Sequence, residues 1–144
     1  MNSLPETLGA LRGYKHYGSR KVPRSVKDEL RENLICKLQR REPLFPGIVG
    51  FDDTVEPQLV NAVLSRHNFI LLGLRGQAKT RLIRMLVTLL DEHCPYVAGC
   101  EIRDDAFAPI CKRCRALVAE QGDDTPIAWL SREERYVENW RRPT

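Results

Sequence analysis

The sequence lacks any apolar run long enough to cross a membrane. Its longest strongly apolar stretch is NFILLGL, residues 68–74, whereas a spanning helix needs about 20 apolar residues. The amino-terminal residues MNSLPETLGALRGYKHYG contain no apolar segment of signal-peptide length either. We therefore expect a cytoplasmic protein without a membrane partner.

Repeats, low-complexity tracts and an extreme composition are also missing. The 144 residues are 42% hydrophobic and 29% charged, which is ordinary for a globular domain and excludes disordered, collagen-like and coiled-coil proteins. Residues 1–44 carry the whole excess of the +4 net charge, with 10 basic against 5 acidic side chains. Because a solvated helix face with mixed charges gives the same count, we do not expect a nucleic-acid partner.

Neither a disulfide framework nor a hydrolase triad is indicated. The 5 cysteines occur without a secretion signal, and the 3 histidines have no recognisable nucleophile beside them. Four cysteines are nevertheless spaced C-x5-C-x10-C-x2-C, namely Cys94, Cys100, Cys111 and Cys114. Such a set can build a tetrahedral zinc site. Cys114 also falls on the apolar stripe of an expected helix, so packing as a small hydrophobic residue is the alternative.

The apolar spacing of the remaining sequence predicts an α/β fold. Helical periodicity occurs over 25–41, from Asp53 onward, from Lys79 onward and over 109–121. Residues 69–72 (FILL) form a continuous apolar run, which is typical of a buried parallel strand. A short strand is expected within 96–102. The acidic pairs Asp104-Asp105 and Asp123-Asp124 are expected to serve turns or helix caps.

The sharpest motif is GLRGQAKT, residues 73–80, which has the form G-x-x-x-x-G-K-[ST] of a phosphate-binding loop with Ala78 before the lysine. Gly73 and Gly76 would let successive N–H groups face a phosphate. Lys79 would add a positive charge, and the Thr80 hydroxyl would reach a magnesium ion. The predicted ATP contacts are Gly73, Leu74, Arg75, Gly76, Gln77, Ala78, Lys79, Thr80 and Arg81.

Hydrolysis requires a second motif, an apolar strand that ends in acidic residues and holds magnesium. Residues 86–92 (LVTLLDE) imitate it but lie on the helix that begins at Lys79, with Asp91 roughly 18 Å from the loop. No later apolar run ends in Asp-Glu. We therefore predict no catalytic residue.

Taken together, four stretches resemble the magnesium-chelatase ATPase-subunit group of AAA+ proteins, which is close to the MoxR-type ATPases. The matching stretch runs from Phe45 to about Tyr136 and includes FPGIVGFDDTVEPQL, FILLGLRGQAKTR, VAGCEIRDDAFAPIC and GDDTPIAW. The resemblance implies a three-layer P-loop fold with a parallel sheet over 44–144. The charge count and the helical periodicity predict that a basic amino-terminal extension with one amphipathic helix precedes it over 1–43. It also implies that Ile48 and Val49 contact the adenine. Such subunits assemble into rings and remodel a partner protein, which is unknown here.

The family's later motifs are missing from this sequence: the acidic strand, the sensor residues, the arginine finger and the helical lid. The predicted function is therefore that of an ATP-binding and magnesium-binding fragment, truncated and unable to hydrolyse ATP alone. Two alternatives stay open. One is a non-catalytic interaction module with a vestigial phosphate loop, and the other is a zinc-stabilised nucleic-acid binder.

Overall fold

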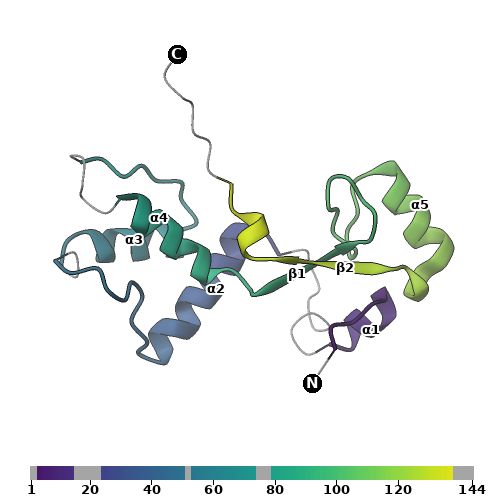
Figure 1. The fold of residues 1–144 in the computed structure, drawn as a ribbon, viewed down its shortest axis with the longest axis horizontal. Coiled ribbons are helices and arrows are strands. Elements are labelled where there is room, and N and C mark those ends of the chain that lie inside the picture. The colour runs from purple at the N-terminus through teal and green to yellow at the C-terminus, as the bar shows by residue number, and fades with distance from the viewer. Residues whose placement is uncertain (1–2, 15–23, 51–52, 74–78, 138–144) are drawn as a thin grey trace, which may run out of the picture. The chain divides into compact units, whose positions relative to one another are not determined.

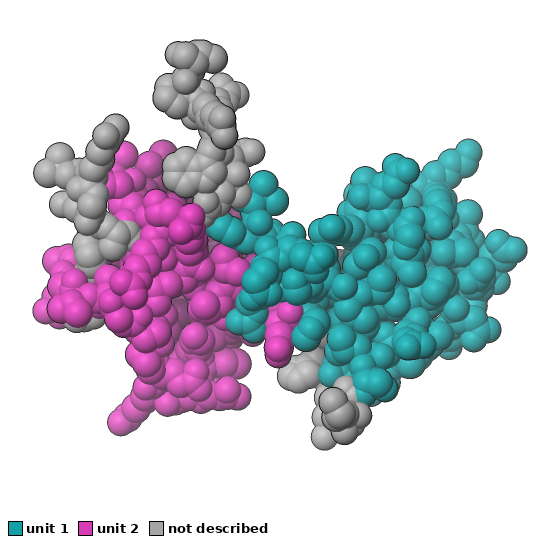
Figure 2. Space-filling view, in the orientation of Figure 1, with its two compact units in different colours: residues 1–24, 93–137 teal, residues 25–92, 138–144 magenta. Residues whose placement is uncertain are grey.

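The computed structural model describes residues 3–14, 24–50, 53–73 and 79–137. The chain divides into two compact units, coloured separately in Figure 2. Unit 1 comprises residues 1–24 and 93–137, and unit 2 comprises residues 25–92 and 138–144. Each unit has its own cluster of buried apolar side chains.

Unit 1 is built on an antiparallel hairpin of β1 (His93–Val97) and β2 (Ile127–Ser131), shown in Figure 1. Val97 lies opposite Ile127 at one end of the ladder, and both side chains are buried. Helix α1 (Leu8–Arg12) and helix α5 (Lys112–Gln121) complete the unit, with the short turns η2 (Gly122–Asp124) and η3 (Glu133–Arg135). The buried cluster consists of Leu8, Leu11, Val97, Cys100, Ala106, Cys114 and Ile127.

Backbone hydrogen bonds attach the amino-terminal residues to the start of β2. The Leu8 N–H donates to the Thr125 carbonyl over 2.9 Å, and the Ile127 N–H donates to the Glu6 carbonyl over 2.8 Å. Leu8 is fully buried, so α1 covers the apolar cluster beside the hairpin. Thus residues more than a hundred positions apart form one core.

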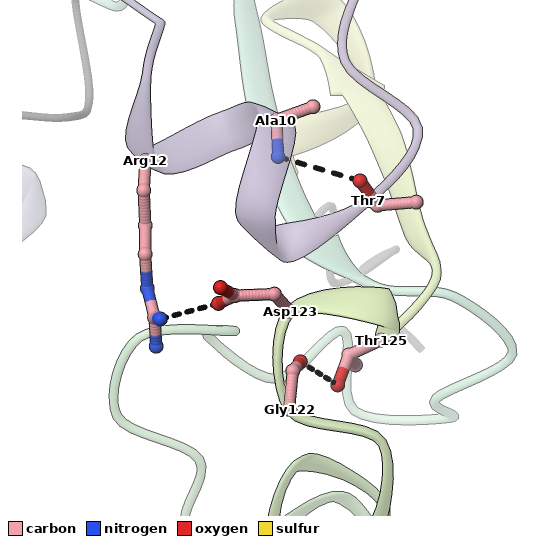
Figure 3. A network of polar contacts seen from close by, with 6 residues as sticks. All are labelled: Thr7, Ala10, Arg12, Gly122, Asp123 and Thr125. Carbon is pink, nitrogen blue, oxygen red and sulfur yellow. Dashed lines mark hydrogen bonds and ion pairs between the residues drawn. The ribbon is translucent and has the colours of Figure 1, made fainter.

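Figure 3 shows how α1 is held against η2. Thr7 Oγ1 accepts the Ala10 N–H over 3.3 Å and so caps the first turn of α1. The Arg12 guanidinium forms an ion pair with Asp123 of η2. The Thr125 hydroxyl donates to the carbonyl of the first residue of η2 over 2.7 Å, which satisfies a fully buried polar side chain.

In its described residues, unit 2 consists of three helices, α2 (Val26–Gln39), α3 (Val55–Leu64) and α4 (Lys79–Leu86), followed by the turn η1 (Val87–Leu89). The predicted start of α2 is confirmed, because Ser25 Oγ accepts the Asp28 N–H over 3.1 Å. The helices and the loop before α3 share one buried cluster, formed by Leu34, Leu44, Phe45, Ile48, Leu59, Val63, Leu82 and Leu89.

Two polar contacts tie α2 to the residues after α4. Glu29 is only 5% exposed, and its Oε1 accepts the Asp91 N–H over 2.7 Å. Asn33 Nδ2 donates to the Leu89 carbonyl over 2.7 Å. These side chains satisfy backbone groups where the helical hydrogen bonding of the chain ends.

The predicted three-layer P-loop fold with a parallel sheet is wrong for the described part of the chain. Its sheet has two strands, β1 and β2, and they are antiparallel. The expected buried parallel strand over 69–72 is not a strand, and Ile70 and Leu72 are 83% and 88% exposed. A parallel strand is buried only when neighbouring strands and covering helices are present. An apolar run does not itself specify those partners.

The described helices are all too short or too polar to span a bilayer.

Candidate functional site

Four side chains of unit 1 converge on one point. Cys100, Asp104, Cys111 and Cys114 each offer one ligand atom, and these four atoms lie within 4.8 Å of one another. Cys100 and Asp104 belong to the segment that follows β1, whereas Cys111 and Cys114 belong to the start of α5. The arrangement could hold a metal ion.

A tight chain reversal after β1 positions Cys100. Gly99 has a φ of +71°, a left-handed conformation that favours glycine. The Cys100 N–H then donates to the Val97 carbonyl over 3.1 Å, and the Val97 N–H donates to the Asp104 carbonyl over 3.0 Å. Arg113 of α5 donates to the Gly99 carbonyl over 2.7 Å, which attaches this reversal to the helix. Cys100 is thereby held close to the start of α5.

Asp104 organises the loop between the reversal and α5. Its Oδ2 accepts the N–H groups of Ile110 and Cys111, each over 2.8 Å, and its Oδ1 accepts the Asp105 N–H over 3.1 Å. Asp104 is 6% exposed. Because an ionised carboxylate has about four acceptor sites, these three bonds leave one for a cation. The carboxylate can therefore orient the loop and bind a metal at the same time.

The C-x2-C pair begins α5. Cys111 is the N-cap residue, and its Sγ accepts the Cys114 N–H over 3.2 Å. Cys114 is fully buried, whereas Cys111 is half-buried. A helix start thus places two sulfur atoms three residues apart on one face, next to Cys100.

The surroundings shift the pKa values of two of the thiols in opposite directions. Hydrogen bonding from the Asp104 backbone lowers the pKa of the Cys100 thiol. Burial raises the pKa of the Cys114 thiol to about 12. Three thiolates and a carboxylate carry four negative charges, which would repel one another strongly at this separation unless a positive charge lay among them. A divalent cation would supply that positive charge and deprotonate the coordinating thiols.

The spacing of the ligand atoms suits a tetrahedral ion. Zinc–sulfur bonds of about 2.3 Å place sulfur atoms about 3.8 Å apart around the metal. The four ligand atoms are within 4.8 Å of one another, so contraction of about 1 Å would complete the coordination sphere.

The structure gathers three of the four cysteines that the sequence indicated as zinc ligands, and it adds Asp104. Cys94 lies on β1, where its Sγ is 3.9 Å from the Pro95 carbonyl oxygen, and it is not one of the four gathered residues. The expected turn role of the Asp104-Asp105 pair is confirmed, since Asp105 Oδ1 also accepts the Phe107 N–H over 2.8 Å. An acidic residue between Cys100 and Cys111 was the available signal for a fourth ligand.

The phosphate-loop motif belongs to unit 2. Residues 74–78 lie outside the described residues, and Gly73, Lys79, Thr80 and Arg81 lie within them. Lys79 is the first residue of α4, and its Nζ donates to the Gly73 carbonyl over 2.8 Å. This hydrogen bond therefore joins the lysine of the motif to the first residue of the motif.

A groove of about 320 Å³ lies beside Lys79. Its lining is otherwise apolar or neutral and comprises Val55, Gln58, Ile70, Leu71, Leu72 and Leu82. The two expected adenine contacts differ in burial, because Ile48 is 9% exposed and belongs to the unit 2 core whereas Val49 is 89% exposed. Arg81 lies against Gly47, where an added Cβ would be 3.0 Å from its guanidinium.

Comparisons with protein-family models, with curated proteins and with solved structures found no match for the chain.

Proposed function

We propose that unit 1 is a zinc-binding module in which Cys100, Asp104, Cys111 and Cys114 hold one zinc ion. The observation that carries this proposal is the convergence of one ligand atom from each residue within 4.8 Å. Three sulfur ligands favour zinc over magnesium or calcium, which prefer oxygen.

The proposed role of the ion is structural. Four protein ligands would close the coordination sphere, whereas a catalytic zinc keeps one position open. Two of the ligands, Cys100 and Cys114, also belong to the apolar cluster of unit 1. The ion would therefore join the reversal after β1 to α5 in a small unit, where metal binding adds directly to folding stability.

Metal analysis of the purified full chain tests this proposal. We expect one zinc per chain, and cobalt substitution should give the visible absorption of a tetrahedral thiolate site. Cys114→Ser should lose the metal. Cys36→Ser and Cys94→Ser are matched controls, because neither residue is among the four gathered ligands, and both should retain it. A wild-type chain that binds no zinc, or a Cys114→Ser chain that binds it as tightly, would contradict the proposal.

The second candidate function is ATP binding by unit 2. The observation that favours it is the position of the Lys79 ammonium group, 2.8 Å from the Gly73 carbonyl oxygen, at the two ends of a phosphate-loop motif. We propose that Lys79 and the first turn of α4 bind the phosphates and that Thr80 contacts magnesium. The sequence resemblance supports this proposal, and with it the assembly of AAA+ subunits into a ring that remodels a partner protein.

Calorimetric titration with ATP and magnesium tests the second candidate. We expect saturable binding by the wild-type chain and its loss in Lys79→Ala. The control is Lys27→Ala, which removes an exposed lysine from α2 of the same unit. Equal ATP affinity in the wild type and Lys79→Ala would exclude the motif as the binding site. Absence of binding in both would favour the interaction-module alternative.

A further inference from the structure

Cys111 and Cys114 form a pair whose thiols differ in access to solvent. Cys111 is half-buried at the N-cap of α5, whereas Cys114 is fully buried one turn into the helix. Their sulfur atoms lie within 4.8 Å, and the Cys114 N–H donates to the Cys111 sulfur over 3.2 Å. A half-buried cysteine whose sulfur accepts a hydrogen bond thus lies beside a fully buried one.

We propose that Cys111 is a site of oxidation by peroxides and that Cys114 resolves the product into a disulfide. The first step transfers one oxygen atom. The Cys111 sulfur attacks the O–O bond, which breaks, so that a sulfenic acid forms and hydrogen peroxide leaves as water. In the second step the Cys114 sulfur attacks the sulfenic sulfur and expels the hydroxyl group, which takes the Cys114 proton and leaves as a second water. The two sulfur atoms together supply the two electrons that reduce the peroxide.

The positions of the two residues permit this bond. A disulfide joins its sulfur atoms at about 2.05 Å, so the pair must close by less than about 3 Å. Cys111 has extended backbone angles, φ −78° and ψ 146°, and precedes the first helical residue. Rotation of its half-exposed side chain can bring its sulfur toward Cys114 while α5 stays intact.

Two other thiols are less suited to the reaction. Cys100 is 8% exposed, which limits the approach of a peroxide to its sulfur. Cys36 is exposed on α2 of unit 2, so a sulfenic acid there would be accessible to solvent. The sulfur atoms of Cys111 and Cys100 also lie within 4.8 Å, but the hydrogen bond from the Cys114 N–H to the Cys111 sulfur distinguishes the C-x2-C pair.

Oxidation would also remove two of the four proposed zinc ligands, and this consequence rests on the zinc-binding function proposed above. Cys100 and Asp104 alone would not retain the ion. We expect disulfide formation in the zinc-loaded chain to release one zinc per chain. We also expect bound zinc to slow the reaction, because coordination occupies the sulfur electron pairs that attack the peroxide.

Tryptic mass spectrometry without reduction tests the proposal on the full chain, prepared both metal-free and zinc-loaded and treated with hydrogen peroxide. Trypsin cleaves after Lys112 and Arg113, so the expected disulfide joins peptide 104–112 to peptide 114–115. A link from peptide 104–112 to peptide 85–103, which contains Cys100, would overturn the pairing. Overoxidation of Cys111 without any linked peptide would overturn the role of Cys114.

Variants and a zinc indicator separate this proposal from the zinc site. In Cys114→Ser we expect the sulfenic acid at Cys111 to persist and to be trapped by a dimedone reagent, whereas Cys36→Ser should form the disulfide like the wild type. A disulfide in a chain that never binds zinc would support oxidation and contradict only the metal site. Zinc binding without any disulfide would contradict the oxidation proposal alone.

Discussion

Asp104 is the residue whose replacement tests the site most directly. Asp104→Ala removes the acceptor of two N–H groups at 2.8 Å, those of Ile110 and Cys111, and of a third, that of Asp105, at 3.1 Å. The side chain is 6% exposed, so the first two groups lose their partner in a largely shielded position. The same substitution removes the proposed carboxylate ligand of the metal.

The expected loss of stability follows from the number of hydrogen bonds that Asp104→Ala removes. A hydrogen bond to a charged group contributes about 1.5–3 kcal/mol, and water that enters the vacated space recovers part of this. We expect a decrease of about 2–4 kcal/mol in the unfolding free energy of unit 1. For a unit of this size each kcal/mol lowers Tm by roughly 4–8 °C.

Denaturant unfolding of the metal-free chain measures this loss apart from any metal effect. Asp104→Asn is the informative companion, because its amide oxygen can still accept the Ile110 and Cys111 N–H groups. Its NH2 group cannot accept the Asp105 N–H, and the anionic ligand is lost. We expect Asp104→Asn to keep most of the metal-free stability but to bind zinc more weakly. Asp124→Ala, which removes an exposed carboxylate of the same unit, should leave both properties unchanged.

Two results would refute this reasoning. A metal-free Asp104→Ala chain within about 0.5 kcal/mol of the wild type would show that the loop does not depend on the carboxylate. Unchanged zinc affinity in both Asp104 variants would show that the residue only positions the loop and that another group completes the coordination.

Three further perturbations test the two cores and the thiols. Gly9→Ala should destabilise unit 1 by about 1–3 kcal/mol, because the added Cβ would lie 2.9 Å from the Asp123 Cβ. Gly13→Ala should show little of this effect in a parallel thermal unfolding measurement, because its Cβ would lie 3.6 Å from its nearest atom. Glu29→Ala should cost unit 2 about 1–3 kcal/mol in denaturant unfolding, because the buried carboxylate accepts the backbone N–H that follows η1; a value near zero would contradict that role. Zinc affinity, measured by chelator competition, should rise between about pH 6 and pH 8. The reason is that the Cys114 thiol, whose pKa is raised to about 12, must lose its proton to the solvent when the metal binds; a pH-independent affinity would exclude that thiol as a ligand.

Local structure in this chain could be predicted well where a few neighbouring residues determine it. Ser25 and Asp28 encode the start of α2 within four residues, and the cap is present. The helix expected over 109–121 is observed as α5, Lys112–Gln121, and it ends at Gly122 as a helix commonly does. Both signals are local, because the Ser25 side chain contacts the backbone of its own helix and Gly122 adopts a φ of +53°, so no distant partner is required.

Strand pairing could not be predicted in the same way, because it joins residues far apart. Residues 69–72 are more apolar than β1, yet His93–Val97 forms the strand. What distinguishes β1 is a partner, Ile127–Ser131, with which five residue pairs are in register, and the amino-terminal residues continue that edge by pairing with Thr125 and Ile127. Hydrophobicity alone therefore indicated a buried strand over 69–72, although no strand of the described residues pairs with this segment.

The candidate metal site combines a local signal with contacts between more distant parts of the sequence. The C-x2-C pair is local, and its position at a helix start follows from the sequence around Cys111. Cys100 and Asp104 join it only because the chain reverses at Gly99 and returns to α5, which no spacing rule specifies. Asp104 has a short polar side chain suited to a turn, and its three N–H partners show that it serves one. Since those same bonds hold the carboxylate next to three sulfur atoms, the turn that shapes the loop is also what would complete the zinc ligand set.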